Sequence, residues 1–146
     1  AAGFSVASSE KLDKFIIAMQ NVATAQLSKL ELASKLNIDL ELSLDEANLE
    51  LAKEVELLAP FGQGNAQPRF LTRQATVYDI VNLGSNEQHI KIRLGSIWAL
   101  GFFKAEAYRH LKIGDRIDLV YYLEINGYNG RSEAQLRIID LKVSDL

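Results

Sequence analysis

The sequence contains no cysteine and only two histidines. Disulfide frameworks, thiolate metal sites and cysteine nucleophiles are therefore excluded, and the fold must be stabilised by packing. It has no run of about 18 or more apolar residues, which argues against a membrane-spanning helix. It also has no basic leader followed by an apolar stretch, so we expect no secretory signal, no membrane partner and a cytoplasmic location.

Catalytic patterns are scarce as well. The two histidines, His89 and His110, fall in different expected elements, and neither has a second histidine or a carboxylate nearby at metal-ligand spacing. None of the serines stands in a GxSxG nucleophile elbow. The sequence therefore predicts no catalytic residue, no metal site and no cofactor within this chain.

Two further patterns have ordinary structural interpretations. The run Gly62-Gln63-Gly64 resembles the start of a phosphate-binding loop, but it follows an expected helix and lacks a third glycine and a following lysine. Three glutamates recur every four residues on one helical face, which we interpret as a solvated face partly neutralised by Lys53: Glu46, Glu50 and Glu54. We expect neither a nucleotide nor a metal ion at these positions.

The remaining composition is that of a globular protein. Hydrophobic residues make up 48% and charged residues 24% of 146 residues, enough for one domain or two small ones. The net charge of −3 is uneven, with five Lys/Arg against ten Asp/Glu up to Pro68 and eleven against nine from Arg69 onward. Because the chain opens Ala1-Ala2-Gly3-Phe4 and its single methionine is Met19, we expect it to be a piece of a longer protein.

The first part of the chain predicts a long amphipathic helix. Residues 3–7 resemble the remnant of a strand, and Ser8 or Ser9 offers a side-chain oxygen that can cap a helix. Apolar residues then recur at steps of three and four from Leu12 to Leu30, which places them on one helical face over about five turns.

A strand and a second helix are expected next. Apolar and polar residues alternate over 36–42, which predicts a strand with one solvated face. Ser43 and Glu46 have the spacing of a capping box, and apolar residues over 44–58 line one face of the helix that should follow. Pro60 should end this helix.

A loop rich in glycine, proline and asparagine occupies residues 60–68. Its glycines permit backbone angles that other residues avoid, and Phe61 should anchor the turn. Five residues are expected to shape the loop: Pro60, Phe61, Gly62, Gly64 and Asn65. The loop is also the best domain boundary, and a strand-rich domain at 69–146 follows it. Before it we distinguish residues 1–35 and a strand–helix connector at 36–68.

After the loop the sequence predicts strands almost throughout. They are expected at 70–81, 87–94, 96–103, 116–125 and 132–143, with a short helix at 104–111. The apolar phase slips between Ile138 and Ile139, as at a β-bulge. Three strands, a helix and two strands are the order of an OB-fold, a barrel that binds oligonucleotides or oligosaccharides. We therefore expect an α+β protein with a helix-and-strand segment before a five-stranded OB barrel, although a different small barrel is also compatible.

The second expected barrel strand carries a basic row. If its apolar residues point into the barrel, a period of two places His89, Lys91 and Arg93 together on the outer face. In OB-folds the outer face of the second and third strands is the usual ligand surface. These three residues are therefore candidates for contact with a phosphate backbone, although surface strands also carry lysine and arginine merely for solubility.

Aromatic residues accompany this row. The loop between the last two strands carries Tyr128 and Arg131, and the third strand supplies Trp98. Single-stranded nucleic acid is held by such pairings, since cations follow the phosphates while aromatic rings stack on bases. Because the third strand is apolar on both faces, Trp98 is equally compatible with a place in the core. The sequence thus predicts a site for single-stranded nucleic acid.

Three sequence runs resemble a known family. In this order and spacing, they are LLAPFGQGNAQPRF (Leu57 to Phe70), QHIKIRL (Gln88 to Leu94) and EINGYNGR (Glu124 to Arg131), and they are similar to the C-terminal part of RecJ-type exonucleases. These enzymes are 5′→3′ single-strand-specific DNases of the DHH phosphoesterase superfamily. The opening AAGFSV is similar to the segment after the Gly-Gly-His motif of their DHHA1 domain. Ala66 departs from the usual proline, and Tyr128 from the common tryptophan.

The resemblance implies a division of labour in a larger enzyme of DNA repair and recombination. The family's ligands for Mn²⁺ or Mg²⁺ lie upstream of Ala1, so no catalytic residue transfers to this chain. Residues 1–35 would be the tail of the DHHA1 domain, and the OB domain would hold single-stranded DNA for the DHH core in cis. The alternative is a protein-docking module that contacts the catalytic core or a single-strand-binding protein, because residues from Arg69 onward carry little net positive charge.

Overall fold

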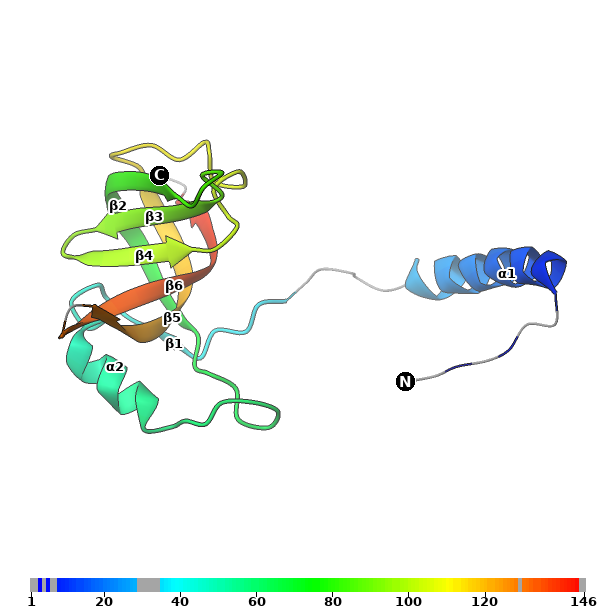
Figure 1. The fold of residues 1–146 in the computed structure, drawn as a ribbon, viewed down its shortest axis with the longest axis horizontal. Coiled ribbons are helices and arrows are strands. Elements are labelled where there is room, and N and C mark those ends of the chain that lie inside the picture. Colours follow the sequence, from blue (N-terminus) through cyan, green and yellow to red (C-terminus); the bar gives the residue numbers. More distant parts are fainter. Residues whose placement is uncertain (1–2, 4, 6–7, 29–34, 129, 145–146) are drawn as a thin grey trace. The chain divides into compact units, whose positions relative to one another are not determined.

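The computed structural model describes residues 3, 5, 8–28, 35–128 and 130–144 of the chain. It divides into two compact units, Ala1–Leu36 and Asn37–Leu146 (Figure 1). The first unit contains a single described helix, and the second contains all described strands together with a shorter helix. The division into three segments that the sequence suggests stays a prediction.

The helix of the first unit, α1 (Ser9–Leu27), confirms the long helix that the apolar stripe predicts. Ser8 occupies the N-cap position, where its backbone carbonyl accepts hydrogen bonds from Lys11 and Leu12, but its side chain makes no capping bond. Several apolar side chains of this helix are exposed: Leu12, Ile16, Ile17, Met19, Val22 and Leu27. Residues 4, 6 and 7 of the strand expected at 3–7, and Leu30 at the end of the stripe, lie outside the described residues.

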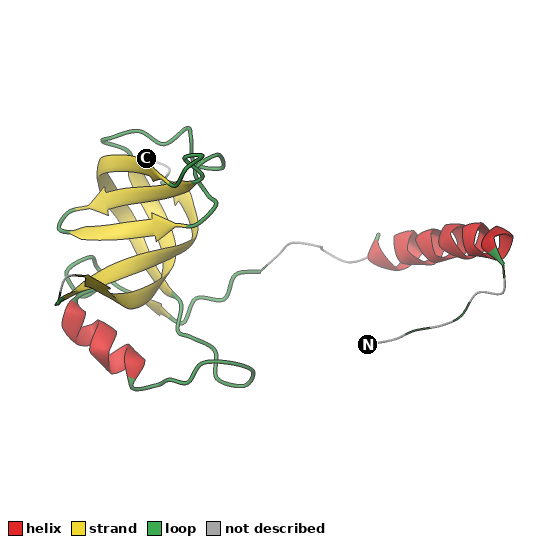
Figure 2. Ribbon diagram, viewed as in Figure 1, coloured by secondary structure: helices red, strands yellow, loops and turns green. Residues whose placement is uncertain are grey.

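The second unit is a closed five-stranded barrel with one added strand (Figure 2). Its barrel strands are β2 (Phe70–Leu83), β3 (His89–Leu94), β4 (Ile97–Gly101), β5 (Arg116–Tyr128) and β6 (Arg131–Val143). They neighbour one another in the order β2-β3-β4-β6-β5, and β5 returns to β2. All these pairings are antiparallel except that of β4 with β6, which is parallel. The α+β class and the OB-fold expected from the sequence are confirmed.

Irregular pairings allow the sheet to close on itself. The bulge expected near Ile138 is present, since Tyr121 pairs with Ile138 and Val120 with Asp140, which leaves Ile139 as the extra residue. The register of β2 shifts twice, once within its pairing with β5 and once within its pairing with β3. These irregularities bend β2 so that it reaches both neighbours.

One hydrophobic core fills the barrel and continues into the segments that cover its two ends. At one end lies α2 (Leu49–Glu56), which buries Ala52 and Val55, and at the other lies the loop between β4 and β5 (Figure 1). This loop inserts Ala105, Tyr108 and Leu111.

The prediction of a helix at 104–111 is wrong, because this segment forms only successive turns. Tertiary contacts outweigh its helical propensity here. The hydroxyl of Tyr108 donates to Asp140 Oδ1 at 2.9 Å and accepts from the Leu141 N–H at 3.2 Å. Burial and the bond to Asp140 raise the pKa of Tyr108 to about 12.

The connector before the barrel is also less regular than expected. The strand predicted at 36–42 is confined to β1 (Leu40–Glu41), which pairs in parallel with the start of β2. The second helix begins after Asn48 rather than after Ser43. The Asn48 side chain accepts hydrogen bonds from the N–H groups at the helix start, whereas Ser43 and Glu46 bond to each other in a separate turn.

A buried hydrogen-bond chain ties this connector to the barrel wall. Thr72 is 3% exposed, and its hydroxyl donates to the carbonyl oxygen of Leu42 at 2.8 Å. Because that bond uses the only hydroxyl proton of Thr72, the Tyr121 hydroxyl at 3.0 Å must donate to Thr72 Oγ1. Burial raises the pKa of Tyr121, which keeps this phenol protonated as a donor.

The glycine-rich loop at 60–68 is closed by its own backbone. Gly62 and Asn65 exchange two backbone hydrogen bonds, at 2.8 and 3.1 Å. The Asn65 side-chain amide also donates to the carbonyl oxygens of Leu58 and Pro60, each at 2.9 Å. Gly64 has a φ of 84°, which side chains avoid, and Phe61 packs against the core.

The two glycines of this loop should respond differently to substitution. We expect Gly64→Ala to lower the free energy of unfolding by about 1–2 kcal/mol, because its φ is left-handed. Gly62→Ala should change it by less than about 0.5 kcal/mol, because that backbone is unstrained and an added Cβ meets open space. Urea unfolding followed by the fluorescence of the single tryptophan measures both, and equal losses would contradict the loop geometry.

Removal of the Thr72 hydroxyl should be costly. We expect Thr72→Val to lower the free energy of unfolding by about 2–4 kcal/mol, because the Leu42 carbonyl and the Tyr121 hydroxyl lose their partner inside the protein. Thr72→Ser retains the hydroxyl and should cost only about 1 kcal/mol for the lost methyl group. The same urea titration applies, and a Thr72→Val variant as stable as the wild type would refute the buried network.

Candidate nucleic-acid interface

The burial of β3 follows the expected alternation. Ile90, Ile92 and Leu94 are at most 1% exposed and fill the barrel. His89, Lys91 and Arg93 are half-buried or exposed and therefore lie on the opposite, outer side of the strand. The period of two thus places the basic row where the sequence indicates, while the part of these residues in binding stays a prediction.

The partner strand β4 adds Trp98 to the same outer side. Ala99 is fully buried, whereas Trp98 and Leu100 on either side of it are only half-buried. Arg93 pairs with Trp98 and Lys91 pairs with Leu100 in the register of the two strands. The sequence left open whether Trp98 lies in the core or on the outer face, and the structure places it on the outer face. The Lys91 Nζ lies 4.5 Å from the centre of the Trp98 ring, a cation–π contact.

The same surface continues across β6 and β5. The register of these strands aligns the Cα positions in two rows: Arg93, Trp98, Gln135 and Glu124 in one, and Lys91, Leu100, Arg137 and Tyr122 in the other. We call these eight residues the outward face. It combines three cations with two aromatic rings and one aliphatic side chain.

Arg137 and Tyr122 are a cation and an aromatic ring of this face that the sequence did not single out. The Arg137 guanidinium carbon lies 4.5 Å from the centre of the Tyr122 ring, and its Nε donates to Glu124 Oε1. Its Nη2 donates to Gln67 of the glycine-rich loop at 3.2 Å. The alternation of β5 could have indicated Tyr122, but the bulge in β6 and its parallel pairing with β4 conceal Arg137.

Acidic residues limit the positive charge of the outward face. Glu124 pairs with Arg137 at 2.5 Å, with both side chains between a third and two fifths exposed. On the other flank, Asp79 of β2 is the register partner of Arg93. The Glu124–Arg137 ion pair is partly exposed, and such pairs are weak, so a phosphate can compete for the Arg137 guanidinium.

His89 has a structural role at the end of the basic row. Its Nδ1 accepts the backbone N–H of Phe103 at 2.9 Å, and its ring lies against the rings of Phe102 and Phe103. A Cβ on Gly84 would lie 3.2 Å from the imidazole, so the neighbouring turn also approaches it closely. His89 is therefore held by the turns around it as well as facing outward.

Tyr128 and Arg131 lie at the tip of the β5–β6 hairpin, where they are register partners. Arg131 is exposed, and the side chain of Tyr128 is outside the described part of the chain. Arg131 has the same strand phase as Gln135 but precedes it by four residues, roughly 13 Å along β6. The described structure therefore does not bring Arg131 into contact with the outward face.

Three glutamates and one histidine that the sequence analysis considered also lie on the surface. Glu50 and Glu54 are exposed on α2, but Glu46 lies in the turn before this helix and accepts hydrogen bonds from Ser43, so the three glutamates do not share one helical face. His110 is exposed in the loop between β4 and β5. Among the described residues, no three His, Asp or Glu side chains lie close enough together to hold a metal ion, so they provide no ligand set for Mn²⁺ or Mg²⁺. No helix within the described ranges is long and apolar enough to span a membrane.

Sequence comparison finds similarity to a nuclease family. A family model described as the RecJ OB domain matches residues 38–140. The single-stranded-DNA-specific exonuclease RecJ of Bacillus subtilis (strain 168) is 28% identical over 131 residues, which cover 87% of this chain and 17% of that protein.

Structural comparison agrees on the fold. Two crystal structures of RecJ from Thermus thermophilus, in complex with Mn²⁺ and with Mg²⁺, match 92% of this chain with TM-scores of 0.70 and 0.66. Their sequences are 20% and 21% identical to it, so this likeness concerns the fold alone. The chain spans only about a fifth of the length of these relatives.

Proposed function

Because this chain belongs to the RecJ OB domain family, we propose that its outward face binds single-stranded DNA on behalf of a larger single-strand-specific exonuclease. The observation that carries the proposal is the pairing of cations with rings across neighbouring strands. Lys91 lies over Trp98, and Arg137 lies over Tyr122. Such a surface offers a charge for each phosphate next to a ring for each base.

The chemistry of the face suits a flexible single strand. Cations attract phosphates regardless of sequence, and the exposed bases of a single strand can stack on aromatic rings, whereas a duplex keeps its bases stacked internally. From β3 to β5 the face crosses four strands, or roughly 14 Å, which is room for only a few nucleotides. We therefore expect moderate affinity with little sequence preference.

The catalytic step would belong to other segments of the larger protein. The relative from B. subtilis is, by its name, a single-stranded-DNA-specific exonuclease. We propose that this chain retains the DNA strand near a DHH catalytic core in cis, a core that hydrolyses DNA in the 5′→3′ direction with Mn²⁺ or Mg²⁺ during repair and recombination. Such tethering raises the local concentration of substrate without any chemistry on the barrel.

Removal of two cations from the outward face should weaken DNA binding in a salt-dependent way. For the 146-residue chain and fluorescent oligo-dT, three phosphate contacts predict a log–log salt slope of about −2. Lys91→Ala/Arg93→Ala should bring the slope to about −0.7 and lower affinity at low salt by about tenfold or more. Fluorescence anisotropy over a series of KCl concentrations measures both quantities.

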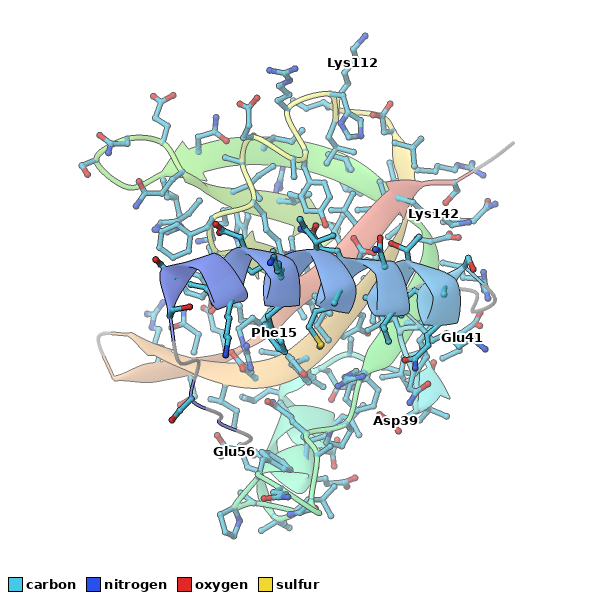
Figure 3. All side chains as sticks on the ribbon, turned by 90° about the vertical axis from the view of Figure 1, so that its right-hand side faces the viewer. Phe15, Asp39, Glu41, Glu56, Lys112 and Lys142 are labelled. Atoms are coloured by element: carbon cyan, nitrogen blue, oxygen red, sulfur yellow. The ribbon has the colours of Figure 1, made fainter. Side chains whose placement is uncertain are left out.

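A matched pair of lysines provides the control. Lys53→Ala/Lys112→Ala removes the same charge from exposed side chains on α2 and on the β4–β5 loop, where Lys112 points away from the barrel (Figure 3). It should leave the slope and the affinity close to those of the wild type. Absence of DNA binding by the wild-type chain at low salt would refute the proposal. Unchanged DNA affinity in the first variant, with loss of binding to the catalytic core or a single-strand-binding protein, would favour the docking function.

Glu124 should act as a competitor for Arg137. We expect Glu124→Gln to raise the affinity for oligo-dT by about two- to tenfold, because the guanidinium no longer pairs with a carboxylate and is free for a phosphate. The control is Glu41→Gln, which breaks the exposed Glu41–Arg73 pair outside the outward face and should have no effect. Lower affinity in Glu124→Gln would show that the ion pair positions Arg137 for binding instead.

A further inference from the structure

Two adjacent phenylalanines stand exposed where the chain leaves β4. Phe102 and Phe103 are 51% and 75% exposed, so two large aromatic side chains lie next to each other at the surface. The turn that presents them depends on Gly101, where a Cβ would lie 2.9 Å from Ile90 Cγ2 and 3.2 Å from Lys104 Cβ. The backbone therefore folds back closely, and both rings point away from the core.

Phe103 also has a strained backbone. Its φ of 55° lies in the left-handed region, which bulky side chains rarely adopt. The conformation is held by the hydrogen bond from the Phe103 N–H to His89 Nδ1. Since most of the ring is exposed, burial of this side chain does not account for the strain. Strained residues of this kind are concentrated at binding sites, where the surrounding structure keeps a side chain in place for a ligand.

The three rings form a fixed group, which we call the terminal platform: His89, Phe102 and Phe103. The imidazole lies 5.4 Å from the Phe102 ring and 4.6 Å from the Phe103 ring, with interplanar angles of 74° and 78°. These are edge-to-face contacts, which orient aromatic rings well. The platform is therefore ordered before any ligand arrives.

The platform lies beside the two rows of the outward face, displaced from them along the direction of β3 and β4. Phe102 is the first residue after β4, two residues beyond Leu100, and His89 precedes Lys91 and Arg93 at steps of two along β3. Because His89 is the first residue of β3, the platform lies at the end of the face nearest the β2–β3 turn. A strand that follows the cations of β3 would reach these rings.

A polar hollow beside Phe103 completes the environment. It measures about 450 Å³, and its lining combines the amide side chains of Asn82, Asn86 and Gln88 with Glu87 and the Glu106–Arg109 ion pair. Amides both donate and accept hydrogen bonds, as the edges of nucleobases require. An aromatic ring for the face of a base thus lies next to polar groups for its edge.

We propose that the terminal platform stacks a nucleobase and so forms the end of the DNA-binding surface. This inference rests on the proposed function, because the base belongs to the strand held by the outward face. The platform contributes base contacts without phosphate contacts. Its removal should therefore change affinity without changing the dependence of binding on salt, unlike the removal of Lys91 and Arg93.

The strained backbone offers a clean variant. Phe103→Gly removes the ring and relieves the strain, yet it keeps the backbone N–H that bonds to His89, so the protein should fold at least as well as the wild type. Combined with Phe102→Ala, it should lower affinity for oligo-dT by about fivefold to a hundredfold, the range of lost base stacking, with an unchanged salt slope. Leu57→Ala removes an apolar side chain that is 84% exposed after α2 and should have no effect.

Comparison of oligo-dT with an abasic deoxyribose phosphate oligomer of equal length identifies the contact. The wild type should prefer oligo-dT, and the platform variant should lose much of that preference while binding the abasic strand as the wild type does. Wild-type affinity for oligo-dT in the variant, or an equal loss for both strands, would overturn the platform. A wild-type chain that binds neither strand would refute the proposed function instead.

Discussion

Closure of the barrel is the constraint on which the rest of the structure depends. β2 pairs with β5 along its first half and with β3 along its second, while β4 and β6 meet in parallel. In a closed barrel one side of every strand faces the core and the other faces outward. Burial of the isoleucines of β3 therefore places Lys91 and Arg93 outside, so the driving force that forms the core also creates the basic row.

The charge on the outward face is balanced rather than strong. Three cations lie near two carboxylates, and both Lys91 and Arg137 also contact an aromatic ring. Under the proposed function, phosphate attraction alone would be weak on this surface, and stacking would supply much of the binding free energy. This balance is compatible with the net charge of −3 of the chain. Under the same proposal, the exposed phenylalanine rings just after β4 would add further stacking contacts.

Local sequence patterns succeeded where burial has a simple period and failed where distant contacts decide. Alternation located β3 and β5, and the phase slip located the bulge at Ile139. The segment 104–111 has helical propensity, but its inward side chains and the bond from Tyr108 to Asp140 hold it as turns. Likewise, the capping pattern at Ser43 forms a separate turn, because Asn48 caps the helix instead. Propensity is a weak effect, and one tertiary hydrogen bond or a few buried side chains exceed it.

The sequence by itself determined where the barrel strands lie along the chain and that the basic row faces outward. Strand propensity and a period of two are local properties, which need no knowledge of distant contacts. Only the tertiary structure decided that Trp98 faces outward, since β4 is apolar on both sides. It also placed Arg137 beside Tyr122 and bound His89 to the strained backbone of Phe103. These neighbours arise from strand register and from turns that meet across the barrel, and both depend on contacts between residues far apart in the chain.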